Sequence, residues 1–146
     1  MNRLFHLLVL AVVLLAGCGY FKAGIWEDDP GNWERAFNSS RPPDVVVVHS
    51  RYWRSPHWSH EFEYFLEIVP TPELREQLFT RNQLHKIKGV EAETAKSGFF
   101  GDKPPWFIPG EATHYEVWVY KEKPGGNFRV FVNKHNGHLF LTDHQV

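Results

Sequence analysis

The chain has 146 residues, of which 16 are Lys or Arg and 17 are Asp or Glu, so its formal net charge is −1 at neutral pH. A nearly neutral chain offers no electrostatic reason to bind nucleic acid or an anionic membrane surface. Aromatic residues make up 16% of the chain, which has a single cysteine, so its core has to be stabilised by packing rather than by an internal disulfide.

The first residues have the organisation of an export signal. A basic start, Met1-Asn2-Arg3, precedes an apolar run from Leu4 to Leu15 that is interrupted by His6. This run is shorter than the about 20 apolar residues of a membrane-spanning helix, but it matches the apolar part of a signal peptide. The segment closes with Leu15-Ala16-Gly17-Cys18, in which two small residues stand directly before the cysteine.

This closing segment resembles the lipobox of bacterial lipoproteins. The resemblance implies that diacylglycerol alkylates the Cys18 thiol, that residues 1–17 are removed and that the new amino terminus is acylated. Several acyl chains hold a protein far more firmly than one, so we expect a tethered protein rather than a spanning one. Gly19 after the cysteine resembles lipoproteins sorted to the outer membrane. An ordinary secretory signal is the alternative, but lipidation better explains a lone cysteine in an exported protein.

The rest of the chain is expected to form a tether and one domain. Residues 18–28 are interpreted as the tether and residues 29–146 as a single domain, which is long enough to bury one core. Without Arg3, 15 basic residues face 17 acidic ones, so the processed protein has a net charge of −2.

A helix and a strand are predicted first. Asp29-Pro30 indicates a helix start with Asp29 as the N-cap. Pro42-Pro43 requires that helix to end near Asn38-Ser39-Ser40. The β-branched run from Val45 to Val48, extended as far as Pro56, predicts a buried strand.

A second strand and a second helix follow. Residues 61–69 alternate, which predicts a strand with one apolar face and one wet face. The apolar face holds Phe62, Tyr64, Leu66 and Ile68, and the wet face holds Glu61, Glu63, Phe65 and Glu67. Thr71 as N-cap and Pro72 at the first position predict a helix that runs through Leu84 and His85 to Gly89.

Three strands complete the domain. Tyr115 to Tyr120 alternates as a strand, and Phe128 to Asn133 forms the first arm of a hairpin. Asn136-Gly137 predicts a two-residue type I′ turn, which places Val132 opposite Leu141. The core face of this hairpin then holds Phe128, Val130, Val132, Leu139 and Leu141, and its other face holds Phe131, Phe140, His135 and His138.

These elements predict an α+β fold, with one antiparallel sheet of about five strands and two helices packed on one face. The lipobox, together with Tyr52-Trp53-Arg54-Ser55-Pro56 and Pro104-Pro105-Trp106-Phe107, resembles small uncharacterised envelope lipoproteins of Gram-negative bacteria. That resemblance implies no catalytic chemistry.

Histidines are the main candidates for chemistry. His57 and His60 share a loop, and His135 faces His138 across the predicted turn, so four imidazoles form a possible zinc site. The sequence has neither an H-E-x-x-H helix nor a cysteine partner for such a site, so we expect no metal and no other cofactor.

Hydrolytic chemistry has little support. The serines lack a G-x-S-x-G elbow. Glu61, Glu63 and Glu67 resemble the paired carboxylates of glycosidases, but acidic residues on the outer side of one strand usually keep that face solvated. A small envelope hydrolase or a metal-dependent enzyme that uses the histidines is therefore the second interpretation.

An aromatic loop from Gly98 to Gly110 is the candidate binding site. Prolines and glycines surround its large apolar residues, which are Phe99, Phe100, Trp106, Phe107 and Ile108. They can form a platform for a sugar ring, a peptide or an acyl chain. The alternative is that they fold back over the sheet near Phe131 and Phe140. We favour this alternative, because each large apolar side chain left in water forfeits about 1.5 to 3 kcal/mol.

The sequence thus predicts a lipid-anchored protein of the cell envelope, at the outer membrane, that acts as a non-enzymatic binding or accessory module. Its expected partners are the membrane, through the lipid, and an envelope protein or a glycan. No nucleic acid is expected among them.

Replacing Cys18 tests the anchor. Cys18→Ser is expected to accumulate as an unprocessed precursor without fatty-acid label, because the lipid is attached through the sulfur. Growth with radioactive palmitate, followed by immunoprecipitation of the full chain, measures this. Equal labelling of the wild-type and variant proteins would contradict the lipoprotein interpretation.

Overall fold

The computed structural model describes residues 23–56, 60–120 and 126–146. The predicted signal peptide 1–17 and the lipidation site Cys18 lie outside these residues, so both stay predictions. None of the helices in the described ranges is both long and apolar enough to span a membrane.

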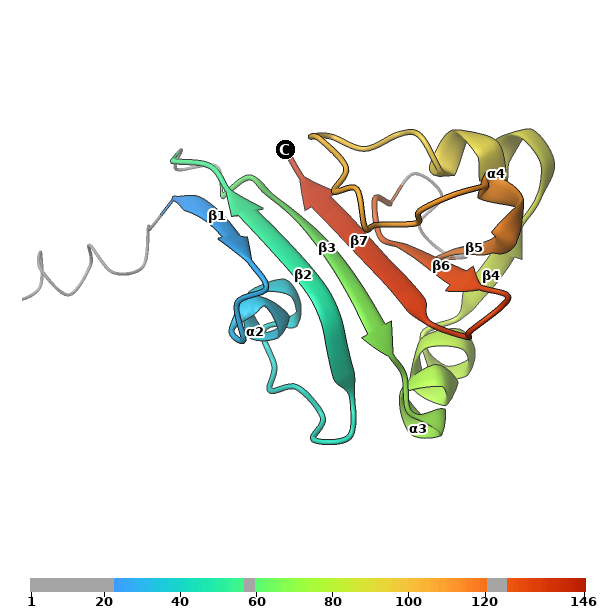
Figure 1. The fold of residues 1–146 in the computed structure, drawn as a ribbon, viewed down its shortest axis with the longest axis horizontal. Helices are drawn as coiled ribbons and strands as arrows, with labels where there is room; N and C mark the ends of the chain where they lie inside the picture. Colours follow the sequence, from blue (N-terminus) through green and yellow to red (C-terminus); the bar gives the residue numbers. More distant parts are fainter. Residues whose placement is uncertain (1–22, 57–59, 121–125) are drawn as a thin grey trace, which may run out of the picture.

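In the described part of the chain, seven strands form one antiparallel sheet (Figure 1). They are β1 (Gly24–Glu27), β2 (Val46–Arg54), β3 (Phe62–Val69), β4 (Leu84–Ile87), β5 (Tyr115–Tyr120), β6 (Arg129–Asn133) and β7 (Leu139–Gln145). Their spatial order is β1-β2-β3-β7-β6-β5-β4, so two meanders meet where β3 pairs with β7. The predicted antiparallel sheet is confirmed, but it has seven strands rather than about five.

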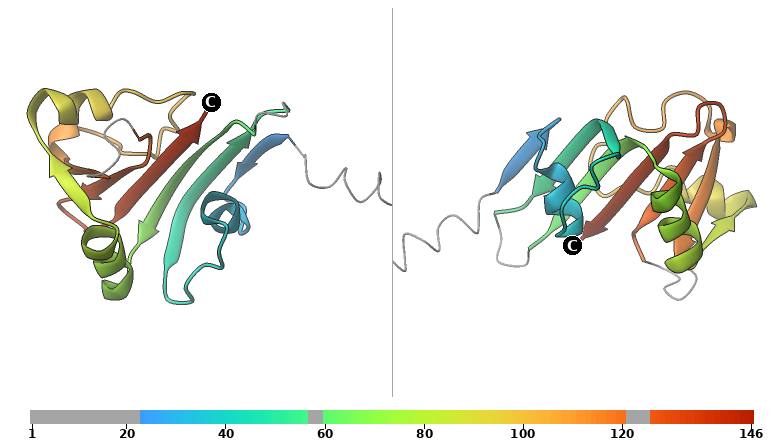
Figure 2. Two further views of the ribbon diagram at one scale, coloured as in Figure 1. Left: turned by 180° about the vertical axis from the view of Figure 1, so that it is seen from behind. Right: turned by 90° about the horizontal axis from the view of Figure 1, so that it is seen from below.

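Helices cover both faces of the sheet. The described α-helices are α2 (Asn32–Phe37), α3 (Pro72–Glu76) and α4 (Gly89–Ala95). A π-helical turn, Gln77–Arg81, continues α3, and a 3₁₀ turn, Ala112–His114, precedes β5. Figure 2 shows α2 and α3 on the same side of the sheet. The expected packing of helices against the sheet is confirmed, but three α-helices are described rather than two, and α4 packs on the other face.

The predicted tether, residues 18–28, is wrong at its C-terminal end. Residues 24–27 form β1, which pairs with the C-terminal half of β2. A strand of four residues alternates too briefly to be recognised from sequence. Because β1 is so short, it leaves the start of β2 without an outer neighbour. Val46 and Val48, which were predicted to be buried, are consequently 56% and 39% exposed.

The second predicted helix is wrong beyond the π-helical turn. Its start is confirmed, since Thr71 Oγ1 accepts the N–H of Leu74 at 3.2 Å. The backbone then takes a left-handed conformation at Gln83, where φ is 54°, and a helix cannot continue through such a residue. Leu84 and His85 belong to β4, whose pairing with β5 supplies the backbone hydrogen bonds that the helix would have made.

Two cores result from covering the sheet on both sides. The first core, under α2 and α3, includes Trp33, Tyr64, Leu66, Leu74, Leu78, Leu139 and Leu141. The second core, under α4 and residues 98–110, includes Phe65, Ala92, Phe107, Phe131 and Phe140. The predicted wet face of β3 is therefore wrong, because Phe65 is 2% exposed and Glu63 is 4% exposed. All members of both cores lie C-terminal to residue 25, so a protein that begins at Gly19 retains every core contact described.

The turn between β6 and β7 is longer than predicted. Val132 pairs with Leu139 rather than with Leu141, and residues 134–138 connect the strands. This shift of two positions keeps every side chain on its predicted face, because side chains alternate with a period of two. The predicted core face is confirmed for Phe128, Val130, Val132, Leu139 and Leu141, and the opposite face for Phe131 and Phe140.

Gly137 tests the conformation of this turn. Its φ is 74°, and an added Cβ would have no neighbour within 4 Å, so a substitution there changes only the backbone preference. Gly137→Val is expected to lower the free energy of unfolding by about 1 to 2 kcal/mol, because a β-branched residue resists this φ. Gly137→Asn is the control, since Asn tolerates the left-handed region. Equal urea midpoints for the two variants would contradict the observed turn.

Candidate functional site

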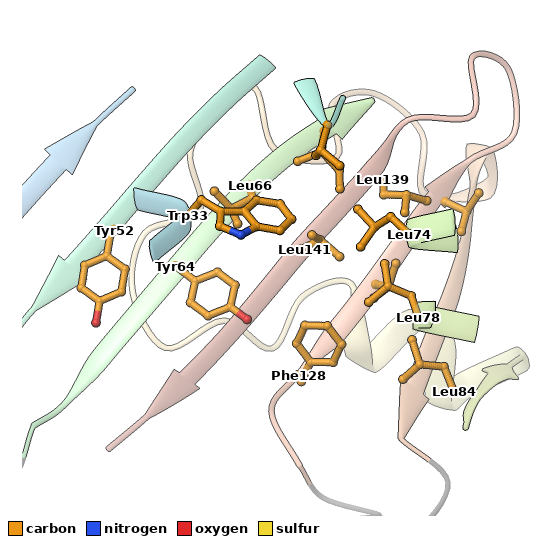
Figure 3. Packing of buried hydrophobic residues seen from close by; sticks show 14 residues of the cluster. Trp33, Tyr52, Tyr64, Leu66, Leu74, Leu78, Leu84, Phe128, Leu139 and Leu141 are labelled. Atoms are coloured by element: carbon orange, nitrogen blue, oxygen red, sulfur yellow. The ribbon is translucent and has the colours of Figure 1, made fainter. Parts of the chain in front are cut away.

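A cleft opens on the first face of the sheet, between α2 and α3. Its volume is about 540 Å³, within the usual range of small-molecule sites. Figure 3 shows Trp33 and Tyr64 on one side of Leu141 and Leu74 and Phe128 on the other. The aromatic lining consists of Trp33, Phe37, Tyr64, Tyr120 and Phe128, and the polar lining consists of Ser39, Ser40, Gln77, Asn82 and Asp143.

Buried hydrogen bonds fix α2, which forms one wall. Asn32 is 1% exposed, and its Nδ2 donates to the Trp26 carbonyl at 2.9 Å and to Ser50 Oγ at 3.0 Å. Asp28 closes the same corner, because its N–H donates to the Ser50 carbonyl at 2.7 Å and its Oδ1 accepts the Ser50 N–H at 2.8 Å. A helix of six residues is not stable alone, so these bonds and the packing of Trp33 hold the wall in place.

Asp29 was the predicted N-cap of this helix, but it lies two residues before the observed N-cap. The helix begins at Asn32 with Gly31 as its N-cap. Asp29 Oδ1 accepts the N–H of Gly31 at 2.8 Å and pairs with Arg35 Nη1 at 2.7 Å. The hydrogen bonds from Arg35 and Gly31 hold the pKa of Asp29 below its ordinary value.

The opposite wall consists of α3 and its π-helical turn. Leu74 and Leu78 project from this wall into the first core. Arg75 Nη1 donates to the Gly137 carbonyl at 3.3 Å, which connects α3 to the turn between β6 and β7. Both walls are thus held in place by contacts between residues that lie far apart in the sequence. None of these contacts involves a ligand.

One row of side chains across the strands forms the floor. In the register of β2, β3 and β7, Tyr52 pairs with Tyr64 and Tyr64 pairs with Asp143. Phe128, directly before β6, lines the same cleft as Tyr120 at the end of β5, and the rings of these two residues lie 5.2 Å apart. The Asp143 carboxylate therefore has aromatic side chains on both sides.

The floor is electrostatically simple. Burial raises the pKa of Tyr64 well above its ordinary value, and the Asp143 carboxylate raises it further. Burial and Asp143, in the same order, raise the pKa of Tyr120. Both phenols stay protonated at neutral pH. Among the described residues that line the cleft, Asp143 is the only charged one.

The predicted binding loop lies on the opposite face of the sheet. Phe107 is fully buried, and its ring lies 5.8 Å from that of Phe131 and 5.6 Å from that of Phe140. Phe99 and Trp106 pack against the same core. These residues and Ile108 fold back over the sheet as expected, whereas Phe100 does not belong to this core. The loop covers the second core and does not form an exposed aromatic platform.

Glu63 holds the start of this loop. Its Oε1 accepts the N–H of Phe100 at 2.9 Å, and its Oε2 accepts the N–H of Gly101 at 2.8 Å. A Cβ at Gly101 would lie 2.9 Å from Oε2, so a larger residue there would have to displace the Glu63 carboxylate from this position. Phe100 itself is 51% exposed, and its ring stacks on His144 with 6.0 Å between centroids. The Glu63 carboxylate was expected to keep its face of the strand solvated, but it is a buried hydrogen-bond acceptor.

Arg129 is the second buried charge on this face. It is 6% exposed, its Nη1 donates to the Ala95 carbonyl at 2.7 Å, and its guanidinium lies 4.8 Å from the Phe99 ring centroid. Burial lowers the pKa of Arg129, and the Glu63 carboxylate opposes that effect. Glu63 and Arg129 together connect the loop and α4 to the sheet.

The predicted histidine cluster does not assemble from its described members. His60 precedes β3, whereas His138 Nδ1 lies 2.8 Å from Oε1 of Glu67 at the other end of that strand. A strand of this length separates the two histidines by roughly 20 Å. His135 packs against His114, with 4.6 Å between ring centroids. In the described ranges, no three potential metal ligands gather. One member of the predicted set lies outside those ranges: His57.

The cleft was not predictable from the sequence, because its walls and floor come from segments that are far apart along the chain. One signal was present, since Trp33 and Phe37 lie four residues apart and predict an apolar face on the first helix. The residues near this helix in the sequence do not indicate which segment its apolar face packs against. Nothing in the sequence near Asp143 indicated that its carboxylate would lie between aromatic rings.

The chain was compared with models of protein families, with curated proteins and with solved structures, and none of them matches. Its function is therefore inferred from the geometry of the cleft.

Phe107 and Phe100 of the aromatic loop test whether a buried and an exposed residue differ in their contribution to stability. In a protein that begins at Gly19, Phe107→Ala is expected to lower the free energy of unfolding by about 3 to 5 kcal/mol, because it leaves a cavity in the second core. Phe100→Ala, the matched control, is expected to lower it by less than about 1 kcal/mol. Urea unfolding followed by circular dichroism measures both values. Similar losses in the two variants would contradict the observed difference in burial.

Proposed function

We propose that this protein is a lipid-anchored envelope protein that acts as a non-enzymatic binding module, with the cleft between α2 and α3 as its binding site. The observation that carries this proposal is a cleft of about 540 Å³ with five aromatic residues in its lining, on a sheet face that is otherwise covered. Ligand sites are commonly preformed clefts with apolar walls and some polar groups, and ten of the fifteen residues that line this cleft are apolar or aromatic.

The predicted lipid anchor would place the cleft close to the membrane. β1 begins at Gly24, only six residues after Cys18. Six extended residues reach about 20 Å, so the edge of the sheet would stay within that distance of the acyl chains. A short tether suits a module that acts on ligands at the membrane surface. We propose the outer membrane as the site of this anchor.

The enzymatic alternative has less support from the geometry. His60 and His138 lie at opposite ends of β3, so they cannot share one zinc ion. Both oxygens of Glu63 accept backbone N–H groups beneath the aromatic loop. These histidines and Glu63 make structural contacts and do not come together in one catalytic site.

A neutral fluorescent probe tests the binding site. N-phenylnaphthylamine is expected to bind the protein that begins at Gly19 with a saturable gain in fluorescence. Ala36 lies on α2 and lines the cleft, so Ala36→Phe should fill part of the site and abolish this gain. Ala112→Phe is the matched control, since Ala112 is also partly exposed but precedes β5 and does not line the cleft. Binding that persists unchanged in a folded Ala36→Phe protein would overturn the proposal.

A further inference from the structure

We propose that an apolar patch on the second face of the sheet, formed by Ile25, Trp53 and Phe100, rests on the surface of a lipid bilayer. This inference goes beyond the cleft, because it assigns a membrane contact to the domain itself. It rests on the lipid anchor of the proposed function, which would bring the patch to the membrane. The cleft lies on the opposite face of the sheet, so this contact would leave it open to water.

Three segments bring large apolar side chains together in the patch. Ile25 of β1 is 55% exposed, and Phe100 of the aromatic loop is 51% exposed. Trp53 of β2 is partly exposed, pairs with Ile25 in the sheet register, and has its ring 5.7 Å from that of Phe100. All three line a depression of about 260 Å³. Exposed apolar side chains that gather in one place commonly mark a contact with a protein or a membrane.

The exposed position of Phe100 is built into the structure. The two carboxylate oxygens of Glu63 accept the N–H groups of Phe100 and Gly101, so the backbone at this ring is held against the sheet. Phe99 packs against the second core, whereas the Phe100 ring stacks on that of His144 and stays half exposed. A buried acceptor therefore keeps an aromatic ring at a defined place on the surface.

The charges around the patch suit an uncharged apolar surface. Among the described residues that line the depression, Arg51 is basic, and Glu63 and Asp102 are acidic. Arg51 is engaged within the protein, since its Nε lies 3.1 Å from Oε1 of Glu27 and its Nη1 donates to the Asp102 carbonyl at 3.1 Å. This lining has no positive excess that would select an anionic partner. Tryptophan is enriched at the interface between water and hydrocarbon, so a zwitterionic bilayer fits the patch.

The place of the patch in the chain identifies the bilayer as its occupant. Ile25 lies at the edge of the sheet (Figure 1), seven residues after Cys18. Seven extended residues reach about 25 Å, so a lipid on Cys18 would keep the patch within that distance of the membrane. Val46 is also exposed, but it lies about 20 Å further along β2. The apolar side chains beside the anchor are therefore those that meet the bilayer first.

Attachment to vesicles through Cys18 tests the contact. Cys18 is the only cysteine of the chain, so a protein that begins there can be coupled to a maleimide-bearing phospholipid in phosphatidylcholine vesicles. Hydroxyl-radical footprinting with mass spectrometry compares side-chain oxidation in the coupled protein and in the free protein with a blocked thiol. The oxidation rate of Phe100 is expected to fall about threefold or more on coupling. Phe37, which is partly exposed on the first face, is the matched control and should keep its rate.

A double variant tests which side chains make the contact. Ile25→Ser combined with Phe100→Ser should abolish the protection of Trp53, measured as the ratio of its oxidation rates in the free and coupled forms of the same variant. Val46→Ser combined with Val90→Ser is the matched control, because these residues are 56% and 84% exposed but do not line the depression. It should retain the protection. Circular dichroism of the free proteins verifies that both variants are folded.

Three results would overturn the inference. The first is an unchanged oxidation rate of Phe100 on coupling, and the second is equal protection of Phe100 and Phe37, which would indicate crowding at the vesicle rather than a defined contact. The third is protection that disappears in about 0.5 M sodium chloride, because salt screens charges and not apolar contacts.

Protection of Phe100 in the free protein that grows with protein concentration would identify a second copy of the chain as the occupant and would also overturn the inference. Coupling replaces the cellular lipid, so these results leave the anchor and the cleft untouched. The proposed function fails separately, through equal palmitate labelling of wild-type and Cys18→Ser proteins or through N-phenylnaphthylamine binding that Ala36→Phe does not change. Loss of the anchor would also remove the membrane contact.

Discussion

The pairing of β3 with β7 is the interaction on which the rest of the structure depends. It joins two meanders that would otherwise be separate sheets, and it connects residues that lie 71 to 83 positions apart. Its register determines both faces at once. On one face it places Tyr64 beside Asp143, and on the other it places Glu63 beside His144. A slip of one residue would exchange the two faces and remove both the cleft floor and the support of the aromatic loop.

The two faces of the sheet are covered in different ways. The second face is sealed by α4 and the aromatic loop, and Glu63 and Arg129 hold these segments with hydrogen bonds to their backbone. Buried charges are tolerated only when such bonds offset their loss of hydration. The first face is covered by two short helices, and the cleft lies between them. The openness of this face is the feature that distinguishes it as the candidate site.

The shape of the cleft depends on tertiary contacts more than on helix propensity. The walls are α2, with six residues, and α3, with five before its π-helical turn. Helices of this length are unstable in isolation, so side chain to backbone bonds hold them. Asn32 supplies such a bond for α2, and Arg75 supplies one for α3. Both bonds end on segments of the sheet or its turns, so the cleft and the sheet form together.

The local pattern of the sequence determined those elements whose signals lie within a few neighbouring residues. The strand that follows Glu61, the Thr71 cap and the two faces of the last hairpin are confirmed, because strand formation and capping depend on adjacent positions. Only the tertiary structure decided that β1 and β4 are strands, that Glu63 is buried and that Asp143 lies in an aromatic row. Each of these outcomes depends on a partner far away along the chain. A strand of four residues, a buried carboxylate and a cleft floor exist only when that partner is in place, so no local pattern could have revealed them.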